Sequence, residues 1–299
     1  MTQAIKLGPR RAAQAKRLSE LAQAMGVDIL AHFYQRPEVK SLASHVGGSL
    51  GLYQAALRSQ AKAIMVCGVD FLAQAIERLR PDLEILVPRV DADCPFSRSV
   101  SPMEVAAIRE KWPGSLLVAD IKASGEVRDL CDLEVGPKGQ LPMGRTGMGP
   151  VHVLPALSAG DPGKFPHCQW PAAACQVHLQ VTAQEVGKAL GQVPGAKLAA
   201  NSLCRPEVRL IADFVGDSQS IFDYCLASPQ GDFLVACESG LVESLRLAKP
   251  QSRFFETETE IFCPNMKLTN IKDMLYCLEA SLCPQAADEG HDPLAGEAR

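Results

Sequence analysis

The sequence predicts an α/β protein of three αβα domains, each with a small parallel sheet, related by a pseudo-threefold axis. The first observation is a phrase that occurs three times, as Arg36–Gly47, Ser124–Gly136 and Arg205–Gly216. The second is that strand and helix patterns alternate along each third of the chain. Units of about 85 residues are small for independent stability, so we expect them to pack on one another.

Three cysteines share the spacing of this repeat. Cys94, Cys175 and Cys263 are 81 and 88 residues apart, and the repeated phrase begins about 30 residues after each of the first two. A repeat that brings three cysteines to equivalent places is what a metal site on a pseudo-threefold axis needs. We expect domains at 15–96, 97–180 and 181–266, with the helix at 268–282 packed back on the first.

The first unit follows from apolar spacing and from its glycines and prolines. Residues 9–26 have helical spacing, and 28–34 form an apolar run typical of a buried strand. Pro37 opens a helix at a position where proline is tolerated. Gly47-Gly48-Ser49 ends that helix and starts another to residue 60. A strand at 63–68, a helix at 70–80 and a strand at 84–88 follow.

The later units repeat this order. The second has a helix at 103–111, a strand at 115–120 and a helix from Glu126. The third has a helix at 183–190, a strand at 196–200, a helix from Pro206 and a strand at 232–236, and a last helix spans 271–280. Glycine and proline are frequent between 136 and 171, which predicts a long irregular loop there. The polar tail at 284–299 is expected to be disordered.

Composition excludes several classes of function. A net charge of −4 without a basic run argues against nucleic-acid binding, and no apolar stretch is long enough to span a membrane. The N-terminus lacks the apolar core of a signal peptide, so we expect a cytoplasmic protein. Eleven cysteines in such a chain argue against a disulfide framework, and most of them, Cys67 and Cys237 among them, are interpreted as buried apolar residues.

The cysteines of the repeat suit two metal centres. Three thiolates with a fourth open position fit either zinc with a bound water or a [4Fe–4S] cluster with one iron that lacks a protein ligand. The cysteines of this set are far apart in sequence and include no CxxC pair, which favours the cluster. Such an iron is a Lewis acid, and this favours dehydration, condensation or isomerisation of small oxygenated acids.

Several stretches resemble the quinolinate synthase family over about residues 15–282. They are Ile29–Gln35, Ser49–Leu52, Cys67–Leu72, Cys175–His178, Glu238–Gly240 and Cys263–Leu268. The resemblance implies three αβα domains around a central [4Fe–4S] cluster held by Cys94, Cys175 and Cys263. It also implies condensation of iminoaspartate with dihydroxyacetone phosphate to quinolinate, an NAD precursor.

The resemblance places further residues at the site. His32 and Tyr34 are expected to handle protons, and Ser49, Ser124, Lys138, His178 and Ser218 are expected to bind substrate. Where the family has a tyrosine and an asparagine, this chain has Asp120 and Lys122, which we expect to share one face of a strand as a new catalytic pair. A histidine and a glutamate of the family are replaced by Asn201 and Leu203.

Three functions follow from this combination. The first is a [4Fe–4S] enzyme of the quinolinate synthase type with an altered substrate. The second is an authentic quinolinate synthase, and the third is a non-catalytic iron–sulfur sensor. The expected partners are a small anionic substrate and the iron–sulfur assembly machinery.

Overall fold

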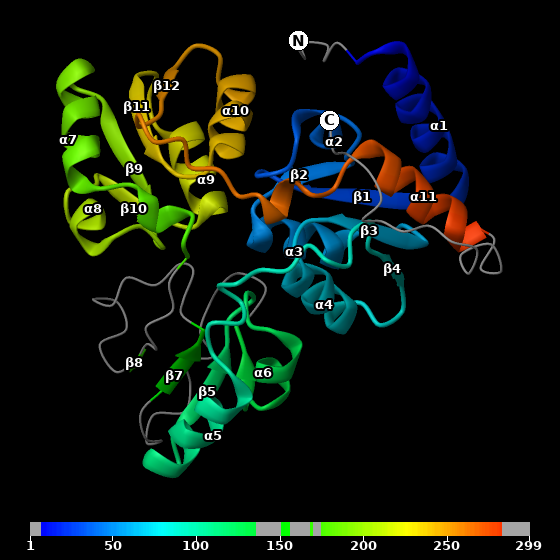
Figure 1. The fold of residues 1–299 in the computed structure, drawn as a ribbon, viewed down its shortest axis with the longest axis horizontal. Helices are drawn as coiled ribbons and strands as arrows, with labels where there is room; N and C mark the ends of the chain where they lie inside the picture. The colour runs from blue at the N-terminus through cyan, green and yellow to red at the C-terminus, as the bar shows by residue number, and fades with distance from the viewer. Residues whose placement is uncertain (1–6, 136–150, 156–167, 170–174, 283–299) are drawn as a thin grey trace, which may run out of the picture.

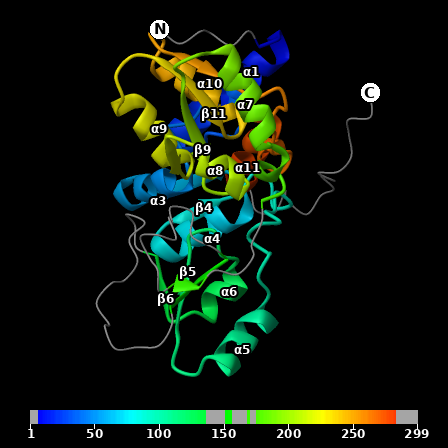
Figure 2. The same ribbon diagram turned by 90° about the vertical axis from the view of Figure 1, so that its left-hand side faces the viewer.

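The computed structural model describes residues 7–135, 151–155, 168–169 and 175–282. They form three units, each with a sheet of four parallel strands and helices against it (Figure 1). The predicted α/β class with three small parallel sheets is confirmed. Figure 2 shows the second unit, with β5, β6, α5 and α6, extending away from the other two.

The first unit has the strand order β2-β1-β3-β4. Its elements are β1 (Val27–His32), β2 (His45–Gly47), β3 (Ala63–Cys67), β4 (Glu84–Leu86), α1 (Pro9–Met25), α2 (Pro37–Lys40), α3 (Ser49–Arg58), α4 (Asp70–Leu79) and the C-terminal α11 (Ile271–Leu282). The residues of β3 are all buried, as expected of a central parallel strand. Helix α1 ends at Gly26, which has the left-handed φ of 70° that glycine adopts readily.

The second unit has the order β6-β5-β7-β8. Its elements are α5 (Pro102–Lys111), β5 (Leu116–Ala119), α6 (Gly125–Asp129), β6 (Leu133–Glu134), β7 (Val151–Leu154) and β8 (Cys168–Gln169). The short 3₁₀ helix η1 (His178–Gln180) follows it in the chain.

The third unit has the order β10-β9-β11-β12. Its elements are α7 (Ala183–Gln192), β9 (Lys197–Asn201), α8 (Pro206–Leu210), β10 (Phe214–Gly216), α9 (Ser218–Ala227), β11 (Asp232–Ala236), α10 (Ser239–Ala248) and β12 (Arg253–Phe255). The 3₁₀ helix η2 (Asn265–Lys267) links it to α11.

The repeat extends to strand register and helix capping. His32 pairs with Gly47 in the first sheet, and Asn201 pairs with Gly216 at the equivalent point of the third. Helices α5 and α7 both begin with a capping box, formed by Ser101 with Glu104 and by Thr182 with Glu185. These caps satisfy backbone N–H groups at the start of each helix.

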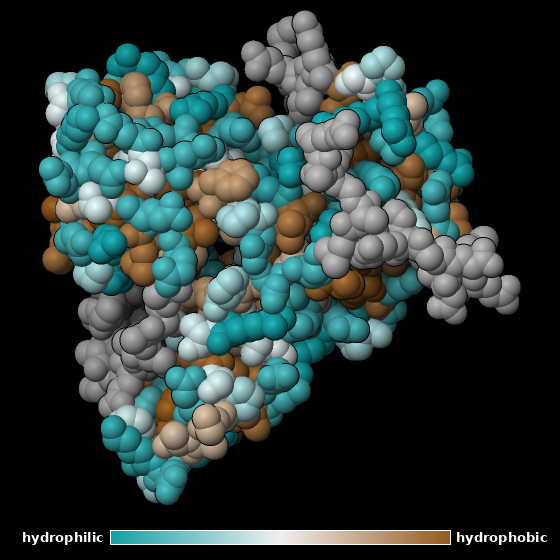
Figure 3. Space-filling model, in the orientation of Figure 1, coloured by the Kyte–Doolittle hydropathy of each residue, from teal (hydrophilic) through white to brown (hydrophobic). Residues whose placement is uncertain are grey.

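The hydrophobic core is shared unequally among the units. The largest cluster of buried side chains joins the first and third units and includes Phe33, Leu72 and Phe233, whereas Ile121 is its one described member from the second. Helices α1 and α11 pack side by side on the other face of the first sheet, around Leu18 and Met274 (Figure 1). The second unit keeps small clusters of its own. The space-filling view shows apolar side chains between polar ones where the three units meet (Figure 3).

Some expectations need correction or lie beyond the described residues. The irregular loop predicted for 136–171 is wrong at 151–154 and 168–169, because Val151–Leu154 forms a strand paired with β5 and Cys168–Gln169 pairs in turn with it. The high glycine and proline content of the region as a whole favoured a loop, although Val151–Leu154 is a short β-branched run. Apart from residue 155, the remainder of the region and the tail at 284–299 lie outside the described residues, and the domain limits stay a prediction. None of the described helices is both long and apolar enough to cross a membrane.

Candidate functional site

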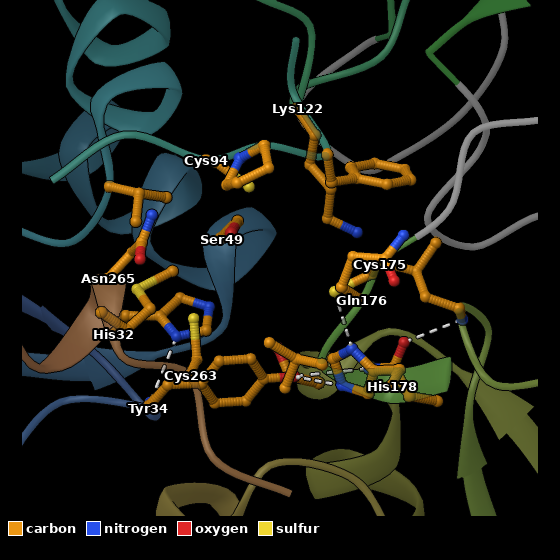
Figure 4. A pocket seen from close by; sticks show the side chains of 18 of the residues that line it. His32, Tyr34, Ser49, Cys94, Lys122, Cys175, Gln176, His178, Cys263 and Asn265 are labelled. Atoms are coloured by element: carbon orange, nitrogen blue, oxygen red, sulfur yellow. Dashed lines mark hydrogen bonds between the residues drawn. The ribbon is translucent and has the colours of Figure 1, made fainter. Parts of the chain in front are cut away.

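The three units meet at a cavity of about 290 Å³. Its walls include residues just beyond the carboxyl ends of β1, β5 and β9, where ligands gather in parallel α/β sheets. Among the lining residues are His32, Tyr34, Ser49, Cys94, Lys122, Cys175, His178, Asn201, Leu203, Ser218 and Cys263. Figure 4 shows side chains from several different elements around the same cavity.

The three cysteines of the repeat all line this cavity. Burial raises the pKa of Cys94 to about 11 and that of Cys263 to about 12. The nearby Cys175 contributes to the raised pKa of both residues, and Cys94 contributes to that of Cys263. Nearby backbone N–H groups, of Ser97 and Phe96 at Cys94 and of Met266 at Cys263, oppose these shifts.

Carboxylates hold the backbone of two of these cysteine loops. Asp70, the first residue of α4, accepts from the Cys94 N–H at 3.1 Å, and Glu238, before α10, accepts from the Cys263 N–H at 3.3 Å. Glu238 is fully buried and pairs with the Lys267 ammonium at 2.7 Å. The positions of both loops are therefore tied to helix N-termini of the first and third units.

The arrangement of the three thiols determines which kind of metal centre this cavity can hold. Across the described ranges, no three His, Cys, Asp or Glu side chains lie close enough to hold a single metal ion. A cube of four irons and four sulfides is wider than one ion, so thiols that share it stand farther apart. Three thiols on one cavity, each from a different loop, fit such a cluster.

The same turn follows the first strand of every unit. His32 Nδ1 accepts from the Tyr34 N–H at 3.2 Å, Asp120 Oδ1 from the Lys122 N–H at 3.0 Å, and Asn201 Oδ1 from the Leu203 N–H at 3.0 Å. One side chain thus closes each turn.

The expected catalytic pair Asp120 and Lys122 does not share a strand face. Strand β5 ends at Ala119, and both residues belong to the turn after it. Only Lys122 lines the cavity, where its ammonium lies 5.9 Å from the Phe96 ring centre. Asp120 is buried and closes the turn. The strand-face prediction is wrong because the strand stops one residue earlier than the apolar run suggested.

Two other expected substrate-binding residues lie elsewhere. The Ser124 hydroxyl accepts from the Val127 N–H at 3.4 Å as the N-cap of α6, and Ser124 is not among the cavity-lining residues. Lys138 lies outside the described residues. Ser49 and Ser218 are the first residues of α3 and α9, and both line the cavity.

Helices α3 and α9 approach each other closely beside the cavity. A Cβ on Gly48 would lie 2.6 Å from Ser218 Oγ and 2.7 Å from the Gln219 backbone nitrogen. The Gly48 N–H donates to Gln219 Oε1 at 3.0 Å. Asp217 caps α9 by accepting from the Ser220 N–H at 2.7 Å. Only glycine at position 48 permits this spacing.

Both histidines of the cavity are buried and neutral at ordinary pH. Burial, with a smaller contribution from the positive charge of Lys122, lowers the pKa of His32 and of His178 to about 3. Neither ring is therefore a proton-loaded acid near pH 7. Each can donate through one nitrogen and accept through the other.

Tyr34 and His178 belong to a buried polar network. The Tyr34 hydroxyl lies 3.1 Å from Cys237 Sγ and 3.4 Å from His178 Nε2, and Asn201 Nδ2 donates to it at 3.4 Å. His178 Nδ1 lies 3.3 Å from Cys175 Sγ (Figure 4). The sequence predicts only a packing role for Cys237, because its apolar neighbours in the chain give no sign of these polar partners.

Comparison with known proteins supports a family assignment. The sequence matches the NadA family, described as quinolinate synthetase A protein, over residues 16–138 and 151–287. It is 31% identical over 278 residues to a quinolinate synthase of Methanosarcina barkeri and 30% identical over 270 residues to one of Pelobacter propionicus. Each alignment covers 88% of both chains.

The E-1-hydroxy-2-methyl-but-2-enyl-4-diphosphate reductase from Plasmodium falciparum aligns with 94% of this chain and 97% of its own at 11% identity. The TM-score of 0.29 is too low to carry an argument. The family match spans most of the chain and agrees with the resemblance found in the sequence. This chain belongs to the quinolinate synthase family of enzymes.

Proposed function

We propose that this chain is a [4Fe–4S] enzyme that condenses or dehydrates small carboxylic acids, with a substrate altered from that of its relatives. The observation that carries the proposal is that three thiols of a threefold repeat line one cavity while residues around them are replaced. Cys94, Cys175 and Cys263 would hold the cluster. When bound, it would supply an open iron as a Lewis acid for an oxygen atom of the substrate.

The neutral histidines and the serines define how a substrate would be held. His32 and His178 are both uncharged near pH 7, so they would offer hydrogen bonds rather than fixed charge. Ser49 begins α3, whose N-cap Gly48 supplies no side-chain cap, so the first N–H groups of α3 favour an anionic group. Ser218 begins α9, where the Asp217 carboxylate already caps the helix. Small anions with several oxygen atoms match this set.

Two replacements in the cavity support an altered substrate. Lys122 is the one Lys or Arg among the lining residues that the structure describes. Leu203 contributes an apolar surface where relatives are expected to carry a carboxylate. A cavity with a cation at Lys122 and an apolar Leu203 is suited to a substrate with a negative charge near Lys122, and the Asp217 carboxylate, which also lines the cavity, would repel such a charge from the start of α9.

Authentic quinolinate synthesis is the second candidate. It is favoured by the relatives' names and by the lining residues His32, Tyr34, Ser49, His178 and Ser218, all of which the family resemblance assigned to the site. Rescue of a strain that cannot make quinolinate separates the two candidates. Growth on the chain would support quinolinate synthesis, and failure of a cluster-loaded chain to rescue would support a changed substrate.

The proposal is tested by anaerobic purification of the full chain. Iron and sulfide are quantified, and the reduced cluster is followed by electron paramagnetic resonance while mono-, di- and tricarboxylic acids are added with and without a phosphate group. We expect near four irons per chain and a spectral change with one class of acid. A chain without stoichiometric iron, or a cluster that no acid perturbs, would contradict the proposal. Cluster loading would depend on the iron–sulfur assembly machinery of the cell.

A further inference from the structure

The sulfur atoms of the three cysteines receive their hydrogen bonds in two different ways. At Cys94 the backbone N–H groups of Ser97 and Phe96, and at Cys263 that of Met266, lie near enough to the sulfur to lower its pKa. At Cys175 the third residue along is His178, and its backbone N–H donates instead to the Cys175 carbonyl oxygen at 3.1 Å. Its ring Nδ1 faces the sulfur at 3.3 Å.

The other side of the His178 ring faces two groups that keep their hydrogen atoms. Burial raises the pKa of Tyr34 well above its usual range and that of Cys237 to about 12, so both are protonated near pH 7. The Tyr34 oxygen lies 3.4 Å and the Cys237 sulfur 3.8 Å from Nε2.

Asn201 restricts where these two hydrogens can go. Its Oδ1 already accepts from Leu203, so its Nδ2 is directed at the Tyr34 oxygen and the Cys237 sulfur, each at 3.4 Å. Both atoms therefore receive a donor from Asn201. The remaining hydrogen atoms are those of the Tyr34 hydroxyl and the Cys237 thiol. If the hydroxyl donates to the Cys237 sulfur, the thiol donates to His178 Nε2; if the thiol donates to the Tyr34 oxygen, the hydroxyl donates to Nε2.

We propose that His178 is a positioning residue that donates from Nδ1–H to the Cys175 sulfur, with its tautomer held by Tyr34 and Cys237 at Nε2. A neutral imidazole has one N–H, and a ring that accepts at Nε2 carries it on Nδ1. Donation to this sulfur withdraws electron density from the ligand that Cys175 would supply, as outer hydrogen bonds to metal ligands do. Its effect on a cluster rests on the proposed function, whereas the tautomer does not.

The first test measures the midpoint reduction potential of the reconstituted cluster in the full chain. Hydrogen bonds to cysteine sulfur stabilise the more negative, reduced state, so His178→Leu should lower the potential. His178→Asn should restore most of the loss, because its amide nitrogen lies near the position of Nδ1. Equal potentials for the two variants would overturn the proposal.

A double-mutant cycle separates positioning from packing. Cys237→Ala should lower the potential in the parent chain and have no further effect in His178→Leu, because its influence passes through the ring. Cys225→Ala is the control, since Cys225 is also a buried thiol of the third unit and lies outside this network. A Cys237→Ala shift that persists without His178, or a Cys225→Ala shift of the same size, would refute the relay.

The tautomer is measured independently of any cluster. Nitrogen-15 spectra of histidine-labelled full chain, prepared without iron, should show the Nδ1–H form for His178, assigned by its loss in His178→Asn. The Nε2–H form would overturn the inference even where the cluster assembles. Absence of a cluster together with the Nδ1–H form would overturn the proposed function and leave the positioning role standing.

Discussion

Cys94, Cys175 and Cys263 come from separate loops, so each contributes an independent ligand to the proposed cluster. Replacing any one with Ala should reduce bound iron from near four atoms to well below one per chain, because two thiolates do not retain the cube. Cys131→Ala is the matched control, since Cys131 packs against the core of the second unit. Anaerobic iron and sulfide assays measure the outcome. Iron loss in Cys131→Ala equal to that in the others would argue against the assignment.

Lys122 offers a prediction about the substrate. Lys122→Met keeps most of the side-chain length and removes the charge, so affinity for the anionic ligand should fall about 10–100-fold, as expected for a charged hydrogen bond. Lys122→Arg, which retains the charge, should keep much of the affinity. Titration followed by the cluster spectrum measures both. Unchanged affinity in Lys122→Met would show that the ligand does not contact this residue.

Because His32 is buried, we expect the folded chain to lose stability in acid. Its pKa is about 3 in the folded chain, where burial and the positive charges of Lys122, Lys267 and Lys40 oppose protonation, with a smaller contribution from His178. Its usual value is 6.5, so between these values the unfolded chain binds a proton that the folded chain excludes. The free energy of unfolding therefore falls as pH decreases from about 6.5 towards 3.

The magnitude can be measured by urea unfolding of cluster-free chain at pH 7 and pH 5. His32 alone should contribute a loss of about 2 kcal/mol between these values, and His32→Gln should remove that part of the difference. His45→Gln, at an exposed position, is the control. An equal acid loss in the parent and in His32→Gln would contradict the prediction.

Sequence reasoning located part of this site. The three cysteines were found because their spacing follows the repeat, and the cavity places all three along its wall. The sequence predicts Asp120 and Lys122 on one strand face, but both lie in the turn after Ala119, where the Asp120 carboxylate accepts from the Lys122 N–H. Cys237 gave no signal, since a thiol among apolar residues has the same pattern whether or not polar groups from distant segments reach it.

At the scale of elements, the contact between α3 and α9 depends on one missing side chain. Gly48→Ala would place a Cβ within 2.7 Å of the Gln219 backbone, which cannot move without shifting α9. We expect a loss of about 1–3 kcal/mol in the free energy of unfolding, as for an overpacked core. Gly187→Ala is the control, because a Cβ there meets nothing within 4 Å.

Chemical denaturation of both variants decides this prediction. The control should gain about 0.5–1 kcal/mol, since alanine is favoured over glycine inside a helix. A Gly48→Ala chain as stable as the parent would show that the two helices separate at little cost.

The elements differ in how well the sequence predicted them. The central strands β1, β3, β5, β9 and β11 were found because they are continuous apolar runs buried on both faces. The edge strands β2, β6 and β10 were missed, since each has at most three residues and lies at the end of the repeated phrase. Pairing with a longer neighbour, rather than their own composition, makes them strands.

For the whole molecule, the unequal sharing of the core predicts unequal stability. The first and third units are joined by one large cluster, whereas the second contacts the first through polar groups such as Gln74 with Gly125 and Arg78 with Glu134. Exposed ion pairs of this kind contribute little. We expect amides of β5 to exchange with deuterium faster than those of β1 and β9.

Hydrogen exchange followed by mass spectrometry of the full chain measures this difference. Slower exchange in β5 than in β1 would contradict it, because it would mean that the second unit is stabilised by contacts beyond those of the described core. The three-unit plan itself was predictable, since a repeat in sequence dictates a repeat in structure. The division of the core was not, because it depends on which faces the units turn towards one another.

The turn that follows β1, β5 and β9 has one more consequence. A single side chain, from His32, Asp120 or Asn201, closes each of these turns. The residue two places further on contributes only its backbone N–H to that hydrogen bond, so its side chain does not close the turn. Lys122 and Leu203 can thus be exchanged without losing the side chain that closes the turn, whereas Tyr34 also contacts His178, Cys237 and Asn201. In such a molecule, replacing one residue after a strand changes the chemistry of the cavity, while the three cysteines that line it stay in place.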